Sequence, residues 1–180
     1  MMGFMIETER CYIRPLNASD AAGIFELDSN PNVHKYLGNT PIKTLTEAEN
    51  VIGLITQQYK DLGIGRWAII EKSTGNFVGW TGFKYIIEPI NNHVNYYDLG
   101  YRLIEGYWDK GIATETAKAC LRYGFEVLKF NEVYGICDVE NTSSKNVLQK
   151  CGLQLIETFD YDGVSHYWMK IKLEDWKNLK

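Results

Sequence analysis

Apolar and polar residues alternate along several segments of the chain in the two-residue rhythm of a β-strand. The segment 77–87 is also rich in aromatic and β-branched residues, which pack well on a pleated surface. Turn signals separate these segments, among them the Asp162-Gly163 pair and the polar stretch 91–93. We predict strands over residues 6–16, 67–71, 77–87, 96–104, 132–139, 153–161 and 165–173.

Other segments space their apolar residues three or four positions apart, as an α-helix does. Ser19 or Asp20 can cap the first of these segments, and Thr46 with Glu49 makes a capping box for the second. Residues 30–44 lie between them and carry Asn-Pro, Gly-Asn and Pro signals, which predict a loop. We predict helices over residues 20–27, 46–63, 114–128 and 143–151, and a short helical turn around residue 176.

This order of elements indicates an α+β fold. We expect a mixed, mostly antiparallel central sheet of about six to seven strands, flanked by helices. The chain has 180 residues, 45% of them hydrophobic, and contains no internal repeat, low-complexity block or linker. These values suit one packed core and exclude a disordered tail protein. We therefore expect residues 1–180 to form a single domain.

Charge and apolar runs restrict the partners and the location. The 19 basic and 23 acidic side chains give a net charge of −4, so no overall positive field attracts a phosphate backbone, and a nucleic-acid-binding module is disfavoured. No stretch approaches the roughly 18 apolar residues of a membrane span. Glu7 and Arg10 interrupt the N-terminus before a signal-peptide core could form. We expect a cytoplasmic protein with no membrane association.

Histidines and cysteines offer neither a metal site nor a nucleophile signature. His34, His93 and His166 lie on different predicted elements at no metal-ligand spacing, so we expect no metal. The cysteines form no C-x-x-C pair, no disulfide framework and no Cys-His signature. We interpret these four residues as reduced, inert thiols: Cys11, Cys120, Cys137 and Cys151.

The segment 98–128 carries the chemistry. A predicted strand runs through a loop with Gly106 and Gly111 directly into a predicted helix. Glycine at 111 lets the backbone approach a ligand closely, and the unpaired N–H groups of the first helical turn favour an anion such as a phosphate. On this pattern alone, Gly111 could equally be an ordinary loop glycine. No GxxxxGK[ST] or GxGxxG motif is present, so a nucleoside triphosphatase or Rossmann dehydrogenase has no support.

Two sequence blocks resemble a known family. The run 107–115, YWDKGIATE, is similar to the coenzyme A pyrophosphate loop of the GNAT acyltransferases. Its W-x-K-G-x-A-T-E form is typical of the branch that includes the ribosomal-protein N-acetyltransferases RimJ and RimL. Asn141-x-x-Ser144 and the following VLQKCGL resemble the family's later helix and strand, and the strand 12–16 resembles its opening. The resemblance covers nearly the whole chain and implies the GNAT fold.

The resemblance implies a role for each matching residue. Backbone amides of the glycine loop would hold the pyrophosphate. Leu103 and Ile104 would pair with the pantetheine amides and offer an N–H to the thioester carbonyl, where it would stabilise the developing oxyanion. Asn141 would hydrogen-bond the pantetheine arm. The implied coenzyme-binding residues are Leu103, Ile104, Lys110, Gly111, Ile112, Ala113, Thr114 and Asn141.

Two further residues are candidates for catalysis. Ser144 matches a position where the family often places a hydroxyl near the coenzyme sulfur, although it could equally be a helix-start serine that satisfies the backbone. Asp98 stands where several relatives carry a base, and an attacking amine must lose a proton. A strand-end aspartate is also commonly a solvated or turn residue. Asp109 and Asn146 depart from the family pattern, and Asp109 adds a negative charge beside the pyrophosphate.

The resulting hypothesis is an N-acetyltransferase that uses acetyl-CoA and no metal, and that acts by direct transfer in a ternary complex. The acceptor would be a primary amine: a protein N-terminal α-amine, a polyamine or another small amine. The alternative is a non-catalytic acyl-CoA-binding protein of the same fold. Likeness to the family also suggests a homodimer.

Overall fold

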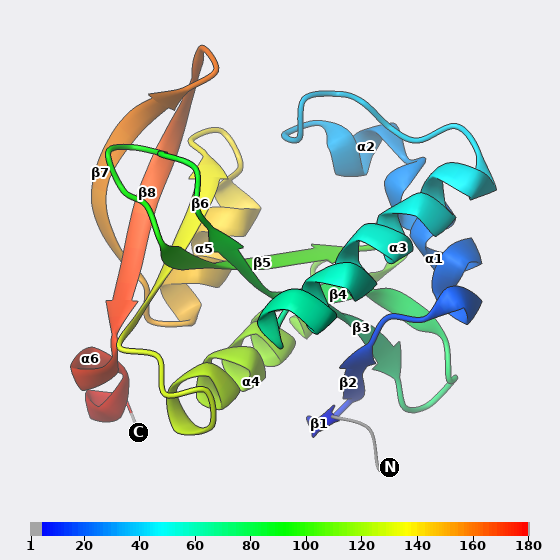
Figure 1. Cartoon of the computed structure of the whole chain (residues 1–180), viewed down its shortest axis with the longest axis horizontal. Helices are drawn as coiled ribbons and strands as arrows, with labels where there is room; N and C mark the ends of the chain where they lie inside the picture. The colour runs from blue at the N-terminus through cyan, green and yellow to red at the C-terminus, as the bar shows by residue number, and fades with distance from the viewer. Residues whose placement is uncertain (1–4, 180) are drawn as a thin grey trace.

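The computed structural model describes residues 5–179 and contains one central sheet, which has eight strands within these residues. Neighbouring strands in the order β1-β2-β3-β4-β5-β6-β8-β7 are hydrogen-bonded, and only β5 and β6 run parallel (Figure 1). The predicted α+β class with a mostly antiparallel sheet is confirmed. The strands are β1 (Ile6–Glu7), β2 (Cys11–Pro15), β3 (Arg66–Glu71), β4 (Phe77–Ile86), β5 (Tyr96–Leu103), β6 (Glu132–Asp138), β7 (Gln154–Tyr161) and β8 (Val164–Lys172).

The strand count exceeds the predicted six to seven because the predicted strand 6–16 is two strands. Its residues fold back on themselves, so that Ile6 pairs with Ile13 and Glu7 with Tyr12. The turn between them is closed by the Thr8 side chain, whose Oγ1 accepts the backbone N–H of Cys11 at 3.0 Å. A side-chain bond of this kind does not change the alternation of residue types, so the sequence pattern did not show the turn.

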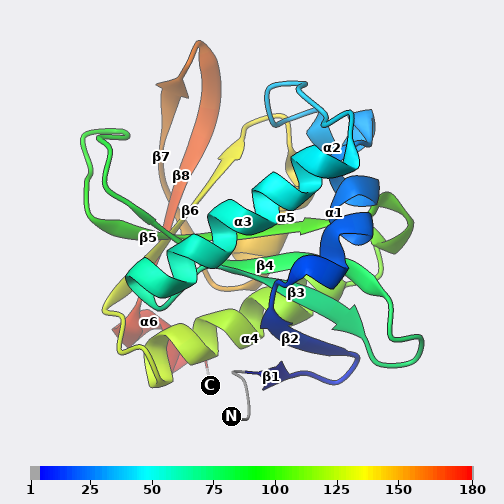
Figure 2. The same ribbon diagram turned by 45° about the vertical axis from the view of Figure 1, so that its right-hand side comes forward.

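Helices cover both faces of the sheet, with α1 and α3 on one face and α4 and α5 on the other (Figures 1 and 2). The predicted loop 30–44 contains the short helix α2, because the Asn30 side chain accepts the N–H of Asn32 and a proline occupies the first turn. The helices are α1 (Ala21–Asp28), α2 (Pro31–His34), α3 (Leu45–Leu62), α4 (Ile112–Glu126), α5 (Thr142–Lys150) and α6 (Leu173–Asn178).

The helix starts agree with the predictions to within one residue at α1 and α5 and differ at α3 and α4 for local reasons. The capping box of α3 consists of Thr44 and Glu47 rather than Thr46 and Glu49, because the Glu47 carboxylate accepts the N–H groups of Thr44 and Lys43. The fourth helix begins at residue 112 instead of 114, since Gly111 in the left-handed region ends the loop earlier. Both shifts come from local hydrogen bonds and backbone conformation, which set helix ends more strongly than apolar spacing does.

Separate hydrophobic cores lie on the two faces of the sheet. On one face, Trp80 and Ala68 pack with apolar residues of α1 and α3. On the other, Phe83 and Leu99 pack with apolar residues of α4. The Phe83 ring is fully buried and meets the Trp67 and Phe130 rings edge to face, with centroids 6.0 and 5.1 Å away. This aromatic cluster fixes β4 and β5 against α4.

Removing the Phe83 ring should therefore weaken the fold. We expect Phe83→Ala to lower the free energy of unfolding by about 3–5 kcal/mol, because the buried ring leaves a cavity that its neighbours cannot fill. Urea denaturation followed by circular dichroism measures this change. Ile87→Ala, at a residue that is 62% exposed, is the matched control and should change stability by less than about 0.5 kcal/mol. A small effect of Phe83→Ala would contradict the assigned core.

Candidate active site

Strands β5 and β6 meet at a single register pair, Asp98 with Tyr134. Beyond it, β5 continues to Leu103 with β4 on one side only. The N–H of Ile104 donates to the carbonyl of Val78 at 3.0 Å, next to the cross-strand pair of Gly79 and Leu103. In an antiparallel ladder such a bond marks Gly79–Leu103 as a non-hydrogen-bonded pair. The Leu103 N–H and C=O therefore point away from β4, into the opening between β5 and β6.

This geometry separates the two predicted strand-end residues. The N–H of Leu103 faces the opening, whereas the N–H of Ile104 is occupied by the Val78 carbonyl. The Leu103 carbonyl accepts the indole N–H of Trp108 at 2.9 Å, so the loop after β5 closes back on the strand end. Of these two residues, only Leu103 offers a backbone donor to a ligand in the opening.

The loop that follows delivers several unpaired donors to the same end of β5. Asp109 and Gly111 adopt φ values of 57° and 77°, and Gly111 caps α4. The first helical hydrogen bond runs from the N–H of Glu115 to the Gly111 carbonyl. Within residues 5–179, the N–H groups of 111–114 have no acceptor. Four backbone donors at the positive end of a 15-residue helix are chemically suited to an anion.

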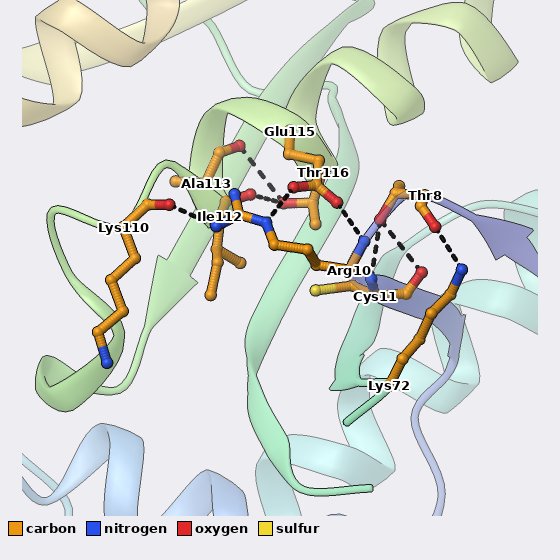
Figure 3. A network of polar contacts seen from close by, with 9 residues as sticks. All are labelled: Thr8, Arg10, Cys11, Lys72, Lys110, Ile112, Ala113, Glu115 and Thr116. Carbon is orange, nitrogen blue, oxygen red and sulfur yellow. Dashed lines mark hydrogen bonds and ion pairs between the residues drawn. The ribbon is translucent and has the colours of Figure 1, made fainter. Parts of the chain in front are cut away.

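Arg10 holds the outer side of this loop (Figure 3). Its backbone N–H and its Nε donate to the two Glu115 carboxylate oxygens at 2.8 and 2.7 Å. Its Nη1 donates to the Lys110 carbonyl at 2.7 Å. The Lys110 ammonium lies 5.2 Å from the centre of the Tyr107 ring. The turn between β1 and β2 thus supports the loop before α4.

Asp98 lies at the point where β5 and β6 separate. Its Oδ1 is buried and has no hydrogen-bond partner within residues 5–179. Burial raises the pKa of the Asp98 carboxyl to about 7, and the charges of Arg66 and Lys84 and the backbone N–H of Ile136 oppose this rise. A carboxyl group with a pKa near neutrality is suited to accept a proton at physiological pH.

Ser144 and Asn141 lie together at the start of α5. The Asn141 side chain accepts the Ser144 N–H at 3.0 Å and caps the helix. The Tyr101 hydroxyl donates to the Ser144 carbonyl at 2.8 Å and lies 3.0 Å from Ser144 Oγ. The Ser144 hydroxyl therefore contacts another hydroxyl instead of capping the backbone. Burial raises the pKa of the Tyr101 phenol, so this side chain stays protonated.

The two candidate catalytic groups lie on opposite faces of the sheet. Side chains alternate along β5, so Asp98 shares a face with Arg102, and Tyr101 occupies the other face. Arg102 contacts Asp28 of α1, whereas Tyr101 contacts Ser144 of α5. The backbone of β5 and the opening beside it lie between the two groups.

Polar contacts hold the α1–α2 segment to the end of β5. Arg102 Nη1 donates to Asp28 Oδ1 at 2.6 Å. The Glu105 carboxylate accepts the side-chain amides of Asn30 and Asn32 at 2.8 and 2.9 Å. The α1–α2 segment, which covers the Asp98 face of the sheet, is therefore held in place by residues at the end of β5, next to the opening.

The remaining candidate chemistries find no support in the described residues. Residues 5–179 contain no group of three or more His, Cys, Asp or Glu side chains that could hold a metal ion. None of the helices in that range is long and apolar enough to cross a membrane. All four cysteines are buried free thiols, and burial raises the pKa of Cys120 and Cys151 to about 12. Such thiols are protonated at neutral pH and are poor nucleophiles.

Comparison with known proteins decides the family. The family model described as "Acetyltransferase (GNAT) domain" matches residues 10–154. This chain belongs to the GNAT acetyltransferase family. Enzymes of this family are acyltransferases that take the acetyl group from acetyl-CoA, which confirms the predicted enzyme class and acyl donor.

Two relatives and one solved structure show how far the GNAT likeness extends. An uncharacterized N-acetyltransferase, p20 of Bacillus licheniformis, is 31% identical over 147 residues, which cover 82% of this chain and 80% of that protein. The spermidine N(1)-acetyltransferase of Escherichia coli K12 is 27% identical over 145 residues, which cover 79% and 72%. The structure of a GNAT acetyltransferase from Bacillus anthracis has a TM-score of 0.79 at 26% identity and covers 95% of this chain and 99% of that one.

Sequence reasoning missed three residues of this GNAT site: Arg10, Tyr101 and Glu115. In the sequence, Glu115 is part of the loop motif with no role assigned to it, and Arg10 lies within the predicted strand 6–16. Tyr101 lies on the same face of β5 as Leu99 and Leu103, which gave it the pattern of a core residue. The sequence signal for Tyr101 is its hydroxyl, which lies between Leu99 and Leu103 on an otherwise apolar strand face.

The glycine at the start of α4 can be tested directly. We expect Gly111→Asp to abolish acetyl-CoA binding, because its carboxylate would lie beside the four donors and compete for Arg10, 3.5 Å from the added Cβ. Gly163→Asp is the matched control, since Gly163 has a similar φ of +79° and open space around it. Calorimetric titration measures both affinities. Unchanged affinity in a folded Gly111→Asp variant would overturn the anion site.

Proposed function

We propose that this protein transfers the acetyl group of acetyl-CoA directly to a primary amine in a ternary complex. One observation supports the proposal: the four unpaired N–H groups at the start of α4 lie near the end of β5 that also presents the Leu103 N–H to the opening. A pyrophosphate and an extended amide chain are the ligands that such donors suit. Asp98 and Ser144 lie on the two faces beside this opening.

The backbone supplies most of the contacts to the donor in this proposal. The N–H groups of residues 111–114 hold the pyrophosphate, and the Lys110 ammonium adds a positive charge. Leu103 pairs with the pantetheine arm, and its N–H stabilises the negative charge that develops on the thioester oxygen. Asn141 uses its side-chain oxygen to cap α5, which leaves its Nδ2 group to donate to the pantetheine arm. Ile104 contributes packing instead of a donor, since its N–H is bonded to Val78.

Side chains on opposite faces of the sheet assist the two halves of the reaction, the attack of the amine and the departure of the thiolate. Asp98 accepts a proton from the amine, which approaches over the face covered by α1 and α3. Its ionised form at pH values above about 7 is the active form. The Ser144 hydroxyl lies on the α5 side of the opening, 3.0 Å from the Tyr101 hydroxyl oxygen. In this route it turns its single proton from Tyr101 to the departing sulfur and donates a hydrogen bond to it. No covalent bond to the protein forms in this route.

The acceptor class follows from the relatives and the charge. A relative that is 27% identical acetylates spermidine by its name, and the loop motif resembles the branch of RimJ and RimL, which supports a polyamine or a protein N-terminal α-amine. The net charge of −4 favours an acceptor that arrives as a cation. Four free, buried thiols support a reducing cytoplasm as the location. Homodimer formation stays a prediction.

The role of Asp98 predicts a pH dependence. A base whose pKa is about 7 is protonated at lower pH, so kcat/KM should rise as the pH increases through about 7 and then level off. Asp98→Asn should lower kcat about a hundredfold or more and remove this inflection. Steady-state kinetics between pH 5.5 and 9 test both. Asp162→Asn in an exposed turn is the control. An Asp98→Asn enzyme with the wild-type profile would exclude Asp98 as the base.

The role of Ser144 predicts a selective loss of rate. Ser144→Ala keeps the helix cap, because Asn141 bonds the backbone N–H of residue 144 and not the hydroxyl. We expect kcat to fall about ten- to a hundredfold, as for loss of one hydrogen bond to a developing charge, with the KM for acetyl-CoA unchanged. Ser143→Ala, at the exposed neighbour, should behave as wild type. Equal kcat values in the two variants would remove Ser144 from the mechanism.

A combined experiment tests the proposed function as a whole. Calorimetry with acetyl-CoA measures binding, and a thiol-release assay against polyamines, peptides and small amines measures turnover. We expect binding together with thiol release that depends on an amine. Binding without turnover on any acceptor would identify a non-catalytic acyl-CoA-binding protein instead.

A further inference from the structure

Arg10 connects the turn between β1 and β2 to the loop before α4, which lies about a hundred residues later in the sequence. Three of its donors are used: the backbone N–H and Nε on the Glu115 carboxylate, and Nη1 on the Lys110 carbonyl. These bonds are 2.7–2.8 Å long, in the range of charge-assisted hydrogen bonds. Figure 3 shows Arg10 between the β1–β2 turn and the loop before α4. The arginine side chain is 44% exposed, so it contributes little to the core.

The bond to the Lys110 carbonyl determines where the next N–H points. The peptide group that joins Lys110 to Gly111 is planar, and its trans form directs the N–H opposite to the C=O. Because Arg10 Nη1 fixes the carbonyl, the Gly111 N–H points away from Arg10. Without this bond the peptide could rotate, because Gly111, at a φ of 77°, restricts the backbone less than any other residue type would. Arg10 therefore orients the first of the four unpaired donors.

The bonds to Glu115 reduce the repulsion between its carboxylate and a bound pyrophosphate. Glu115 lies in the first turn of α4, close to the donors that suit a pyrophosphate. Burial opposes its ionisation, but hydrogen bonds from Thr8 and from Arg10 outweigh this and hold the pKa of the Glu115 carboxyl below its usual range. Glu115 is thus an anion at neutral pH, and the Arg10 guanidinium offsets its repulsion of a bound phosphate.

We propose that Arg10 is a positioning residue for the donor's pyrophosphate, acting through the Lys110 carbonyl and the Glu115 carboxylate. The proposal rests on the proposed function, since it concerns the same donor site. It predicts that the effect of replacing Arg10 on affinity depends on whether the acyl donor carries a pyrophosphate. Loss of Arg10 should weaken binding of the pyrophosphate. It should leave binding of the pantetheine end unchanged, because in the proposed function that end contacts β5 and Asn141.

The experiment compares two donors. S-acetylpantetheine keeps the thioester and the pantetheine arm of acetyl-CoA but lacks the pyrophosphate and the nucleotide. We expect Arg10→Met to raise the Kd of acetyl-CoA about tenfold or more, as for loss of charge-assisted hydrogen bonds, and to leave the Kd of S-acetylpantetheine unchanged. Calorimetric titration at constant ionic strength measures both. Arg122→Met, which removes an exposed arginine from the same helix α4, should bind both donors as wild type does.

Two further variants keep the test decisive. Arg10→Lys retains the charge, but one ammonium cannot reproduce the planar set of donors, so it should recover only part of the lost affinity. The double variant Arg10→Met/Glu115→Gln serves if Arg10→Met does not fold, because it removes the unpaired anion together with the arginine. It still lacks the bond to the Lys110 carbonyl, so it should bind acetyl-CoA more weakly than wild type and S-acetylpantetheine as wild type does. Equal losses with both donors, no loss with acetyl-CoA, or wild-type affinity in Arg10→Lys would overturn the proposal. Absence of acetyl-CoA binding by the wild-type protein would instead overturn the proposed function.

Discussion

The site depends on how two parallel strands pair. β5 and β6 are in register only at Asp98 and Tyr134, and β5 then continues alone on that side as far as Leu103. Backbone N–H and C=O groups that a full ladder would have used are left facing an opening in the middle of the sheet. A central sheet with an unpaired strand edge normally needs a covering element or a ligand. Here the opening creates the place where an extended, amide-bearing ligand can complete the sheet.

The surrounding elements are arranged about this opening. A loop joins β5 to α4, and Ile112 in the first turn of α4 lies in the same hydrophobic cluster as Leu103, so the unpaired N–H groups of α4 lie near the end of β5. Alternation along β5 assigns Asp98 to the face of α1 and Tyr101 to the face of α5. A reaction in the plane of the sheet can therefore receive its nucleophile from one face and release its leaving group toward the other. The proposed direct transfer uses this arrangement, with Asp98 on one face and the leaving group toward the other.

Local donors also explain how an acidic protein suits a polyanionic substrate. The net charge of −4 does not describe the start of α4, where unpaired backbone N–H groups and the helix dipole act at short range. Glu115 would oppose them, and Arg10 neutralises it at 2.7 Å. In the proposed function, the overall negative charge favours a cationic amine as the second substrate.

The sequence was sufficient for the features that local pattern determines, and insufficient for those that register determines. The glycine loop, the helix after it and the α+β order follow from residue types at fixed spacing, so they could be predicted. Which of Leu103 and Ile104 offers its N–H depends on the pairing of Leu103 with Gly79, which no one-strand pattern encodes. The Arg10–Glu115 pair joins residues 105 positions apart, and a single sequence does not show such contacts.

Hydrogen–deuterium exchange of the backbone amides tests whether acetyl-CoA binds to the unpaired N–H groups of Leu103 and residues 111–114. Exchange would be measured for the wild-type protein with and without saturating acetyl-CoA, with peptides that resolve residues 103 and 111–114. We expect acetyl-CoA to slow exchange at both places, while the Ile104 amide, already bonded to Val78, changes little. Binding that protects other segments and leaves the amides of Leu103 and residues 111–114 unchanged would contradict this expectation.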